Sequence, residues 1–408
     1  MIEAVDALIV GAGPAGLKAA AELGQLGLRV LVVDEYPEPG GRLLGQSSPP
    51  GGARWDGRQV ARQLTQQAEK AAARLCLGTP VYNLERGPDG FRARLGPASA
   101  AVAARTVLVA TGATELPIPL PGWTLPGVLT VGGGQVLWSV YGVAPGRRGY
   151  IVGTGALSFA VAQELAAGGV QVAGIVLAPP GPERAHLGSV ASQWDQLVAQ
   201  RAGAPPWIRI GAAWLASSRR RRLSLAALPF GGVPAFGTRL RLGAAAVAID
   251  GGQAVEAVTL RRMTAEGRLY GPVCQEPADF VLLSGGLRPL ADLISAAGAT
   301  MMVEGALGGA VPVLDPGGQT SVPGLFAAGS ATGVEGAAVA MAQGALAGLA
   351  MARRLGAPVD DHRLTEARIA VGQARSSARF SFRTGIEAAR ARVEAAWPGG
   401  GDGADPDA

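Results

Sequence analysis

The chain has 408 residues, of which 48% are hydrophobic and 16% charged, enough for two or three domains around a large buried core. Its formal net charge of +5 comes almost wholly from arginine, because Lys18 and Lys70 are the only lysines. No known nucleic-acid-binding module is visible, so nucleic acid is not an expected partner. The one dense basic run, Arg219–Arg222, is interpreted as a solvated loop, with docking of an acidic partner as the alternative.

The cysteines and histidines exclude several kinds of chemistry. Cys76 and Cys274 are far apart and form no CxxC, which argues against a redox-active disulfide or an iron–sulfur cluster held by this chain alone. His186 and His362 are the only histidines, so neither a zinc site nor a histidine triad is expected. Any redox chemistry must therefore be carried by a bound cofactor. No leader-like segment or membrane-spanning run is visible, and we expect a cytoplasmic protein without a membrane span.

The first predicted unit is a strand, helix and strand between Asp6 and Glu35. An apolar strand at 7–10 leads into the glycine motif GAGPAG, and a helix with one apolar face follows. A second apolar strand at 30–33 ends at Asp34. A carboxylate there can accept both hydroxyls of an adenosine ribose and would repel a 2′-phosphate, so NADP is not expected at this site.

The glycine motif supplies the phosphate-binding loop of this unit. Gly11 permits the tight turn, Gly13 lets a pyrophosphate approach the backbone, and Gly16 lets the helix pack closely on the strand. The pyrophosphate would lie on the free N–H groups of the helix N-terminus. The expected binding residues of this unit are Gly11, Ala12, Gly13, Pro14, Ala15, Gly16, Asp34 and Glu35.

The next stretch completes a first nucleotide domain. Its predicted elements are a glycine loop at Gly40–Arg42, an amphipathic helix at 56–76, a meander of strands at 79–84, 91–95 and 101–104, and a buried strand at Thr106–Thr111 that ends at Gly112. A linker rich in proline and glycine follows at 117–127.

A second strand, helix and strand unit begins near Gly149, but its fingerprint is incomplete. Ser158 replaces the third glycine, and no acid stands at the end of the strand predicted at 170–177. Arg184, the nearest candidate for an NADP phosphate, lies several residues further on. We therefore do not expect NAD(P) binding at this second site, and interpret the unit as a scaffold.

The remaining elements return the chain to the first domain. They are a β-rich stretch at 209–262, a strand at 278–284 expected to make the return, a strand at 325–328 that ends in Gly329 and Ser330, a small-residue helix at 333–355, and a polar tail after Trp397. The expected fold is α/β with two Rossmann-like dinucleotide-binding domains, the second inserted in the first. The expected divisions are 1–120 with 275–357, 121–274, and a C-terminal extension at 358–408 with a disordered tail.

These motifs resemble the two-dinucleotide-domain flavoprotein family. The stretch ATGATELPIPLPGWTLPGV at 110–128 is similar to flavoprotein subunits of hydrogen cyanide synthase and of opine and hydroxyproline dehydrogenases. YGVAPGRR at 141–148 and LLSGG at 282–286 look instead like the large subunit of heterotetrameric sarcosine oxidase. The resemblance covers roughly residues 5 to 355 and does not specify a substrate.

The resemblance implies a cofactor, partners and further site residues. It implies FAD at the first site. It also implies a partner flavoprotein of the amino-acid oxidase type that takes electrons from an amine, which this chain then relays. A second flavin, with FMN as the candidate, is implied at a subunit interface. Many relatives carry a cysteine-rich [2Fe–2S] domain that we do not find here, so a small separate subunit is expected to supply such a cluster. The further residues implied to line the site are Gly41, Arg42, Val81, Ala110, Thr111, Gly112, Gly329, Ser330, Gly336 and Ala337.

Two alternatives remain open at the level of sequence. Ser330 stands where family members commonly have Asp, which removes an acceptor for a ribityl hydroxyl. In the alternative that follows from this, the first site holds a permanent adenine nucleotide and the chain is a non-catalytic structural subunit. The other alternative is a stand-alone NAD(P)H-dependent flavoprotein reductase, which needs a working second site. No residue of this chain is assigned as a catalytic acid, base or nucleophile.

Overall fold

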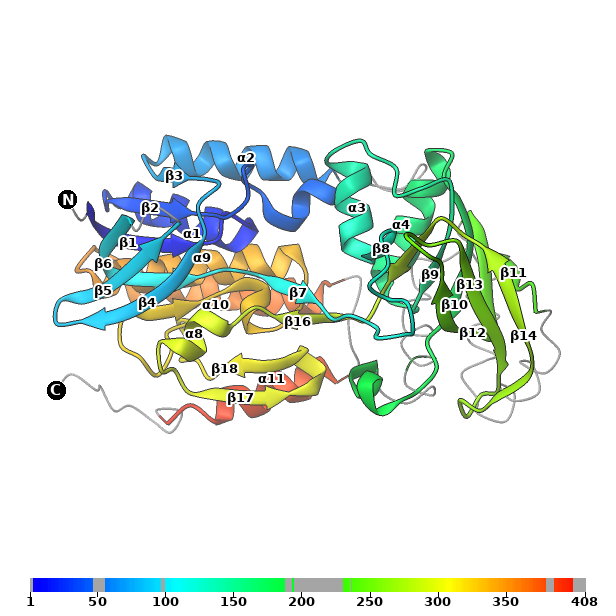
Figure 1. Cartoon of the computed structure of the whole chain (residues 1–408). Coiled ribbons are helices and arrows are strands. Elements are labelled where there is room, and N and C mark those ends of the chain that lie inside the picture. Colours follow the sequence, from blue (N-terminus) through cyan, green and yellow to red (C-terminus); the bar gives the residue numbers. More distant parts are fainter. Residues whose placement is uncertain are drawn as a thin grey trace.

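The computed structural model describes residues 3–46, 56–96, 100–187, 193, 230–235, 237–378 and 385–398. The Arg219–Arg222 run, the start of the predicted β-rich stretch and the polar tail beyond Pro398 lie outside these residues. The described part of the chain forms two lobes, each built on its own large sheet (Figure 1). It contains no helix long and apolar enough to cross a membrane.

The first lobe is a nucleotide-binding fold around a seven-stranded sheet. Its strands run in the order β3-β2-β1-β6-β5-β4, with β19 parallel to β6. Their bounds are β1 Glu3–Val10, β2 Val30–Val33, β3 Arg74–Cys76, β4 Val81–Gly87, β5 Gly90–Leu95, β6 Ala100–Val109 and β19 Leu325–Ala327, and the helices are α1 Pro14–Gln25, α2 Gly57–Lys70 and α9 Ala337–Arg354. The predicted strand–helix–strand unit is confirmed, with β1 parallel to β2 and to β6.

Three expectations about this lobe need correction. The helix predicted at 56–76 ends at Lys70, because Ala72 adopts a left-handed φ of 61° and the chain then enters β3. The strands expected at 101–104 and 106–111 are one strand, β6, whose first half pairs with β5 and whose second half pairs with β19. The helix expected from Gly333 begins only at Ala337.

The second lobe contains an eight-stranded sheet in the order β14-β13-β12-β10-β9-β15-β8, with β11 beside β12. The bounds are β8 Val128–Thr130, β9 Arg148–Val152, β10 Gln171–Leu177, β11 Val233–Ala235, β12 Thr238–Asp250, β13 Ala257–Met263, β14 Leu269–Pro277 and β15 Phe280–Leu283, and the helices are α3 Val131–Ser139 and α4 Ala156–Ala167. The strand expected at 278–284 is β15, and it was expected to return the chain to the first domain. That expectation is wrong, because β15 pairs with β9 and β8 in the sheet of the second lobe. The crossing therefore lies after Ser284 rather than near residue 275.

Short elements connect the lobes and close the first one. They are β7 Ala113–Glu115 with β16 Leu287–Pro289, α8 Asp292–Ala296, β17 Met301–Glu304 with β18 Gly309–Pro312, and the 3-10 turns η1 Gly41–Gly45, η2 Pro182–Leu187, η4 Gly305–Leu307 and η5 Gly329–Thr332. The C-terminal extension contributes α10 Asp361–Ser376 and α11 Ile386–Ala395. Helix α10 packs on α9, and α11 lies against η4 and β17–β18 (Figure 1).

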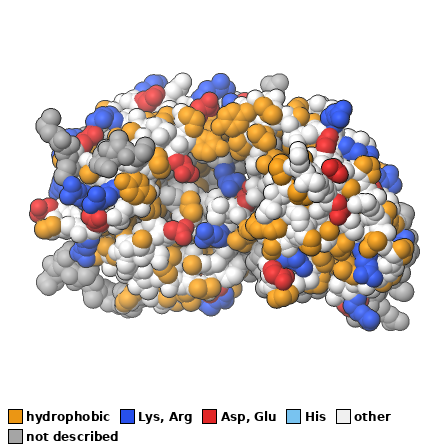
Figure 2. Space-filling model, viewed as in Figure 1, with side chains coloured by type: hydrophobic (Ala, Val, Ile, Leu, Met, Phe, Trp, Pro, Cys, Tyr) orange, Lys and Arg blue, Asp and Glu red, His pale blue; other side chains and the backbone are white. Residues whose placement is uncertain are grey.

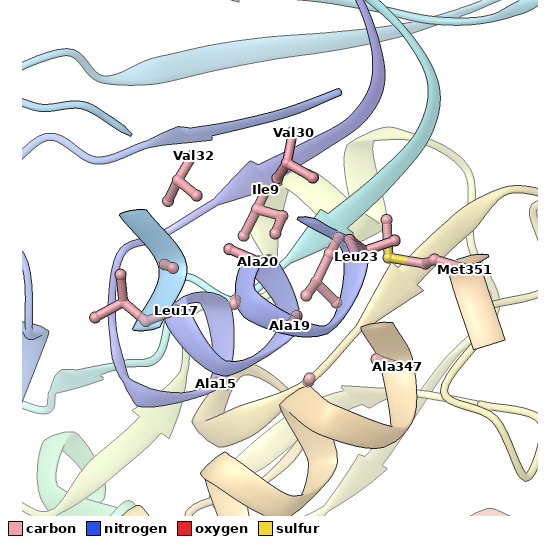
Figure 3. Close-up of a cluster of buried hydrophobic side chains, with 14 of the residues drawn as sticks. Ile9, Ala15, Leu17, Ala19, Ala20, Leu23, Val30, Val32, Ala347 and Met351 are labelled. Carbon is pink, nitrogen blue, oxygen red and sulfur yellow. The ribbon is translucent and has the colours of Figure 1, made fainter. Parts of the chain in front are cut away.

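The core of the first lobe lies on both sides of α1. Figure 3 shows Ala20 and Leu23 of this helix next to Ile9 of β1 and Val30 of β2. Its other side meets α9 through small residues, and a Cβ at Gly344 would lie 2.1 Å from the Ala15 carbonyl oxygen. The two helix backbones therefore touch, which fixes the N-terminal end of α9 relative to the glycine loop.

Candidate cofactor site

The glycine loop of the first lobe lies at the carboxyl ends of three parallel strands. Gly11 donates its N–H to the Val33 carbonyl at 2.8 Å, and Ala110 donates to the Val10 carbonyl at 2.8 Å. Gly11 has a φ of 109°, and a Cβ there would lie 2.4 Å from the Ala110 carbonyl oxygen. Only glycine fits that position.

The other two glycines of the loop have different roles. A Cβ at Gly16 would lie 1.9 Å from the Gly11 carbonyl oxygen, so this glycine is required for packing between the helix and the loop. A Cβ at Gly13 would meet no atom within 4 Å, and its φ of −76° is allowed to any residue. Gly13 therefore faces open space at the N-terminus of α1, as a pyrophosphate-binding glycine must.

Asp34, which follows β2, is held beside this loop. Its Oδ2 accepts the Ala12 N–H at 2.5 Å and its Oδ1 accepts the Tyr36 N–H at 2.8 Å. Each carboxylate oxygen keeps a further lone pair, so the side chain can still accept ribose hydroxyls. Glu35 is exposed. Val81 begins β4 two residues after Thr79, whose N–H donates to the Asp34 carbonyl at 2.8 Å.

A second loop crosses over Gly13. Gly40 donates its N–H to the Ala12 carbonyl at 2.8 Å, and a Cβ at Gly41 would lie 3.2 Å from Gly13 Cα. The next residue, Arg42, donates from Nη2 to the Ala113 carbonyl at 3.0 Å. Arg42 thus links this loop to the chain segment that leaves β6.

The segment after β6 is tied to the returning chain. Thr111 Oγ1 donates to the Leu290 carbonyl at 2.5 Å, and Leu290 donates its N–H to the Gly112 carbonyl at 3.0 Å. Ala110 is 7% exposed, and its carbonyl group packs against the turn at Gly11. Leu290 was not foreseen as part of this arrangement, because no motif marks it and its contact with Thr111 spans 179 residues.

The last part of the site comes from η5 and the start of α9. A Cβ at Gly329 would lie 3.0 Å from Ala15 Cβ, and the Gly329 N–H donates to Gln343 Oε1 at 2.9 Å. Ser330 lies in the same turn. Gly336 precedes α9 with a φ of 102°, and no side chain caps that helix, so the N–H groups of its first turn, beginning with Ala337, can bind a ligand. Gln343 was also missed, although a lone polar residue within an apolar helix is a usable signal.

The expected site residues therefore come from segments that meet around the glycine loop. The open position at Gly13, the uncapped N-termini of α1 and α9, and the oriented carboxylate of Asp34 suit a flavin adenine dinucleotide. Among the residues that the structure describes, no group of three or more His, Cys, Asp or Glu side chains could hold a metal ion.

The corresponding loop of the second lobe repeats the tight turn of the first, at Gly153, but differs where the third glycine would stand. Ser158 is fully buried, and its Oγ donates to the Gly153 carbonyl at 2.9 Å. Arg184 donates to the Pro119 carbonyl at 2.6 Å and to the Pro179 carbonyl at 2.9 Å. Two of its guanidinium nitrogens, Nη1 and Nε, therefore bind main-chain carbonyl groups, and the end of β10 carries no acid.

The fold and the site define the class of protein: an oxidoreductase with two Rossmann-like, dinucleotide-binding domains. A family model described as pyridine nucleotide-disulphide oxidoreductase matches residues 5–196, and one described as glucose inhibited division protein A matches 314–357. The chain is 32% identical over 373 residues to the A subunit of opine oxidase from Rhizobium meliloti (strain 1021), covering 87% of this chain and 72% of the relative. It belongs to the family of opine oxidase A subunits.

One further relative and one solved structure are also similar to this chain. Over 195 residues the chain is 34% identical to the alpha subunit of sarcosine oxidase from Rhizobium meliloti (strain 1021), covering 43% of this chain and 19% of that longer protein. The crystal structure of L-proline dehydrogenase from P. horikoshii superposes with a TM-score of 0.63 at 20% identity, covering 92% of this chain and 60% of that one. This structural likeness supports the fold.

Proposed function

We propose that this chain binds FAD in the first lobe and relays electrons within a multi-subunit complex that oxidises an amine or amino acid of the opine, hydroxyproline, sarcosine or glycine type. The observation that carries the proposal is the open position at Gly13, flanked by the Asp34 carboxylate and by the Gly41–Arg42 loop. Membership of the opine oxidase family supports the oxidoreductase assignment.

The residues of this chain would bind and orient the cofactor. The free N–H groups at the start of α1 would hold the pyrophosphate, and Asp34 would accept the ribose hydroxyls. Gly329, Ser330 and the first turn of α9 would meet the ribityl chain and the flavin ring. FAD bound there would supply the capacity to accept and pass on electrons, and no residue in the described part of the chain is assigned as an acid or base for the amine.

The partners proposed are a flavoprotein of the amino-acid oxidase type and a small [2Fe–2S] subunit, with FMN at a subunit interface and a cytoplasmic location. The chain's relatives are named as subunits, which supports assembly with other chains. In Figure 2, apolar side chains gather along the upper edge where the two lobes meet, a composition suited to a protein interface.

The test is to denature the purified chain and identify the released nucleotide by its absorption spectrum and mass. Released FAD supports the proposal and shows that Ser330 is tolerated. A colourless protein that releases NAD, ATP or AMP contradicts it and favours the structural alternative. The matched variants are Gly13→Glu, which places a carboxylate in the open space and is expected to abolish nucleotide retention, and Gly13→Ala, which is expected to fold normally.

A further inference from the structure

The C-terminal helix α11 inserts one arginine beside the segment that leads into α9. Arg390 is only 6% exposed and lies with the apolar residues Ala389 and Val393 on the buried face of α11. Its Nη1 donates to the Thr332 carbonyl at 3.0 Å, and its Nη2 donates to the Glu335 carboxylate. A Cβ at Gly333 would lie 2.6 Å from Nη2, so the guanidinium spans the backbone from Thr332 to Glu335.

Glu335 is the second charged group of this cluster. Its side chain is 7% exposed, and Arg375 of α10 approaches it with Nε 3.0 Å from Oε2. The carboxylate stands two residues before the first residue of α9, where a negative charge opposes the binding of electron-rich groups by the helix N-terminus. Two arginines from the C-terminal extension neutralise it.

The arrangement is poorly explained by stability alone. Removing an arginine from water is costly, and Arg390 Nε is buried without a hydrogen-bond partner in the described part of the chain. Buried ion pairs of this kind are often no more stabilising than an apolar pair of similar size. These contacts are explained directly if Arg390 fixes the Thr332–Glu335 segment and neutralises the Glu335 carboxylate.

We propose that Arg390 is a positioning residue for the flavin end of the cofactor site: it fixes the loop before α9 and neutralises Glu335, so that the first turn of α9 presents a net positive end to the flavin pyrimidine. This inference rests on the proposed FAD site. The C-terminal extension then acts on the redox cofactor through its helices, without contacting it.

The experiment compares the full-length variants Arg390→Met and Arg392→Met. Arg392 is two residues along the same helix and binds Glu304 in a bidentate ion pair at 2.7 Å, so it anchors α11 without touching the 332–335 segment. FAD affinity is measured by titrating the apoprotein, and the midpoint potential of bound FAD by spectroelectrochemistry. We expect Arg390→Met to raise the dissociation constant of FAD about tenfold and to lower the midpoint potential, because the reduced anionic flavin loses stabilisation. Arg392→Met is expected to match the wild type in both.

A third variant, Glu335→Gln, separates charge from loss of structure and is informative even if Arg390→Met does not fold. Removing the carboxylate is expected to raise the midpoint potential, opposite to the effect of Arg390→Met. The inference is overturned if Arg390→Met and Arg392→Met behave alike, or if Glu335→Gln lowers the potential or leaves it unchanged. A wild-type chain that binds no added FAD would instead overturn the proposed function.

Discussion

At the scale of single residues, the three motif glycines differ in what they tolerate. Gly13 faces open space, whereas a Cβ at Gly16 would collide with the Gly11 carbonyl oxygen at 1.9 Å. Glycine therefore has a packing role at position 16, and we propose a ligand-binding role for it at position 13. The sequence suggested both roles, and the distances now give each a distinct consequence.

We expect Gly16→Ala to destabilise the chain by about 3 kcal/mol, because backbone must move to admit the methyl group. Gly13→Ala should change the free energy of unfolding by less than about 0.5 kcal/mol. Chemical denaturation of both variants measures this difference. Equal midpoints for the two variants would show that the close contact at Gly16 is not present in solution.

A buried polar cluster in the second lobe makes stability depend on pH. Tyr150 donates to Glu276, and Arg241 donates to Tyr150 Oη at 3.0 Å and to Glu276 Oε1 at 2.7 Å. Burial, reinforced by the Glu276 carboxylate, raises the pKa of Tyr150 to about 12. The hydrogen bond from Arg241 lowers the pKa of Glu276 below its ordinary value.

The stability from Tyr150 is present below the ordinary tyrosine pKa of about 10 and is lost as pH rises toward the folded value. That from Glu276 is present above the ordinary glutamate pKa and is lost as pH falls through its lowered folded value. We expect Tyr150→Phe to cost about 1 kcal/mol at neutral pH and to flatten the fall in melting temperature above pH about 10. If the melting temperature of this variant falls above about pH 10 as steeply as that of the wild type, Tyr150 is not the source of the fall.

At the scale of elements, contact between α1 and α9 positions the two helix N-termini around the site. Small residues allow this contact: a Cβ at Gly344 would lie 2.1 Å from the Ala15 carbonyl oxygen, and one at Gly348 would lie 2.9 Å from the Ala19 carbonyl oxygen. Figure 3 shows Ala15 and Ala19 of α1 beside Ala347 of α9. Separation of these helices would widen the space in which the cofactor is proposed to lie.

The prediction at this scale uses two helical glycines. Gly344→Ala is expected to destabilise the chain by about 2 kcal/mol and to weaken nucleotide retention, because it pushes α9 away from α1. Gly372→Ala, in α10, meets nothing within 4 Å and should stabilise by about 0.5–1 kcal/mol. Thermal unfolding of both proteins and their nucleotide content check this, and retention lost equally in both would contradict the assigned role of the α1–α9 contact.

At the scale of the whole molecule, the two lobes share one kind of fold but differ in their binding loops. The first carries an open glycine position and an oriented acid. In the second, Ser158 donates to the loop carbonyl of Gly153 and Arg184 is held by carbonyl groups. These differences support the proposal that the chain holds one dinucleotide, in the first lobe, and does not reduce a flavin with a second one.

We expect NADH and NADPH to leave flavin bound to the purified chain oxidised over many minutes. Anaerobic mixing followed by absorbance of the flavin measures this, with dithionite as the control that shows the flavin to be reducible. Rapid bleaching by either nucleotide would restore the stand-alone reductase as the better assignment.

The sequence by itself determined what depends on local pattern. Strand β2 was predicted with its observed bounds, and helices α1 and α4 were recognised, because apolar periodicity and glycine motifs act over a few residues. It also marked the segments that are proposed to form the first site, and the incomplete fingerprint of the second. It misplaced β15, because an apolar run such as Phe280–Leu283 fits either sheet equally well.

Only the tertiary structure decided which distant residues meet. The contacts of Thr111 with Leu290, of Gly329 with Gln343 and of Glu335 with Arg390 join segments that no short motif connects. The sequence treated the C-terminal extension as a region outside the nucleotide domains, yet α11 places a buried arginine beside the start of α9. The physical reason is that hydrogen bonds and charge pairs depend on distance in space, whereas pattern in a single sequence records only the neighbours along the chain.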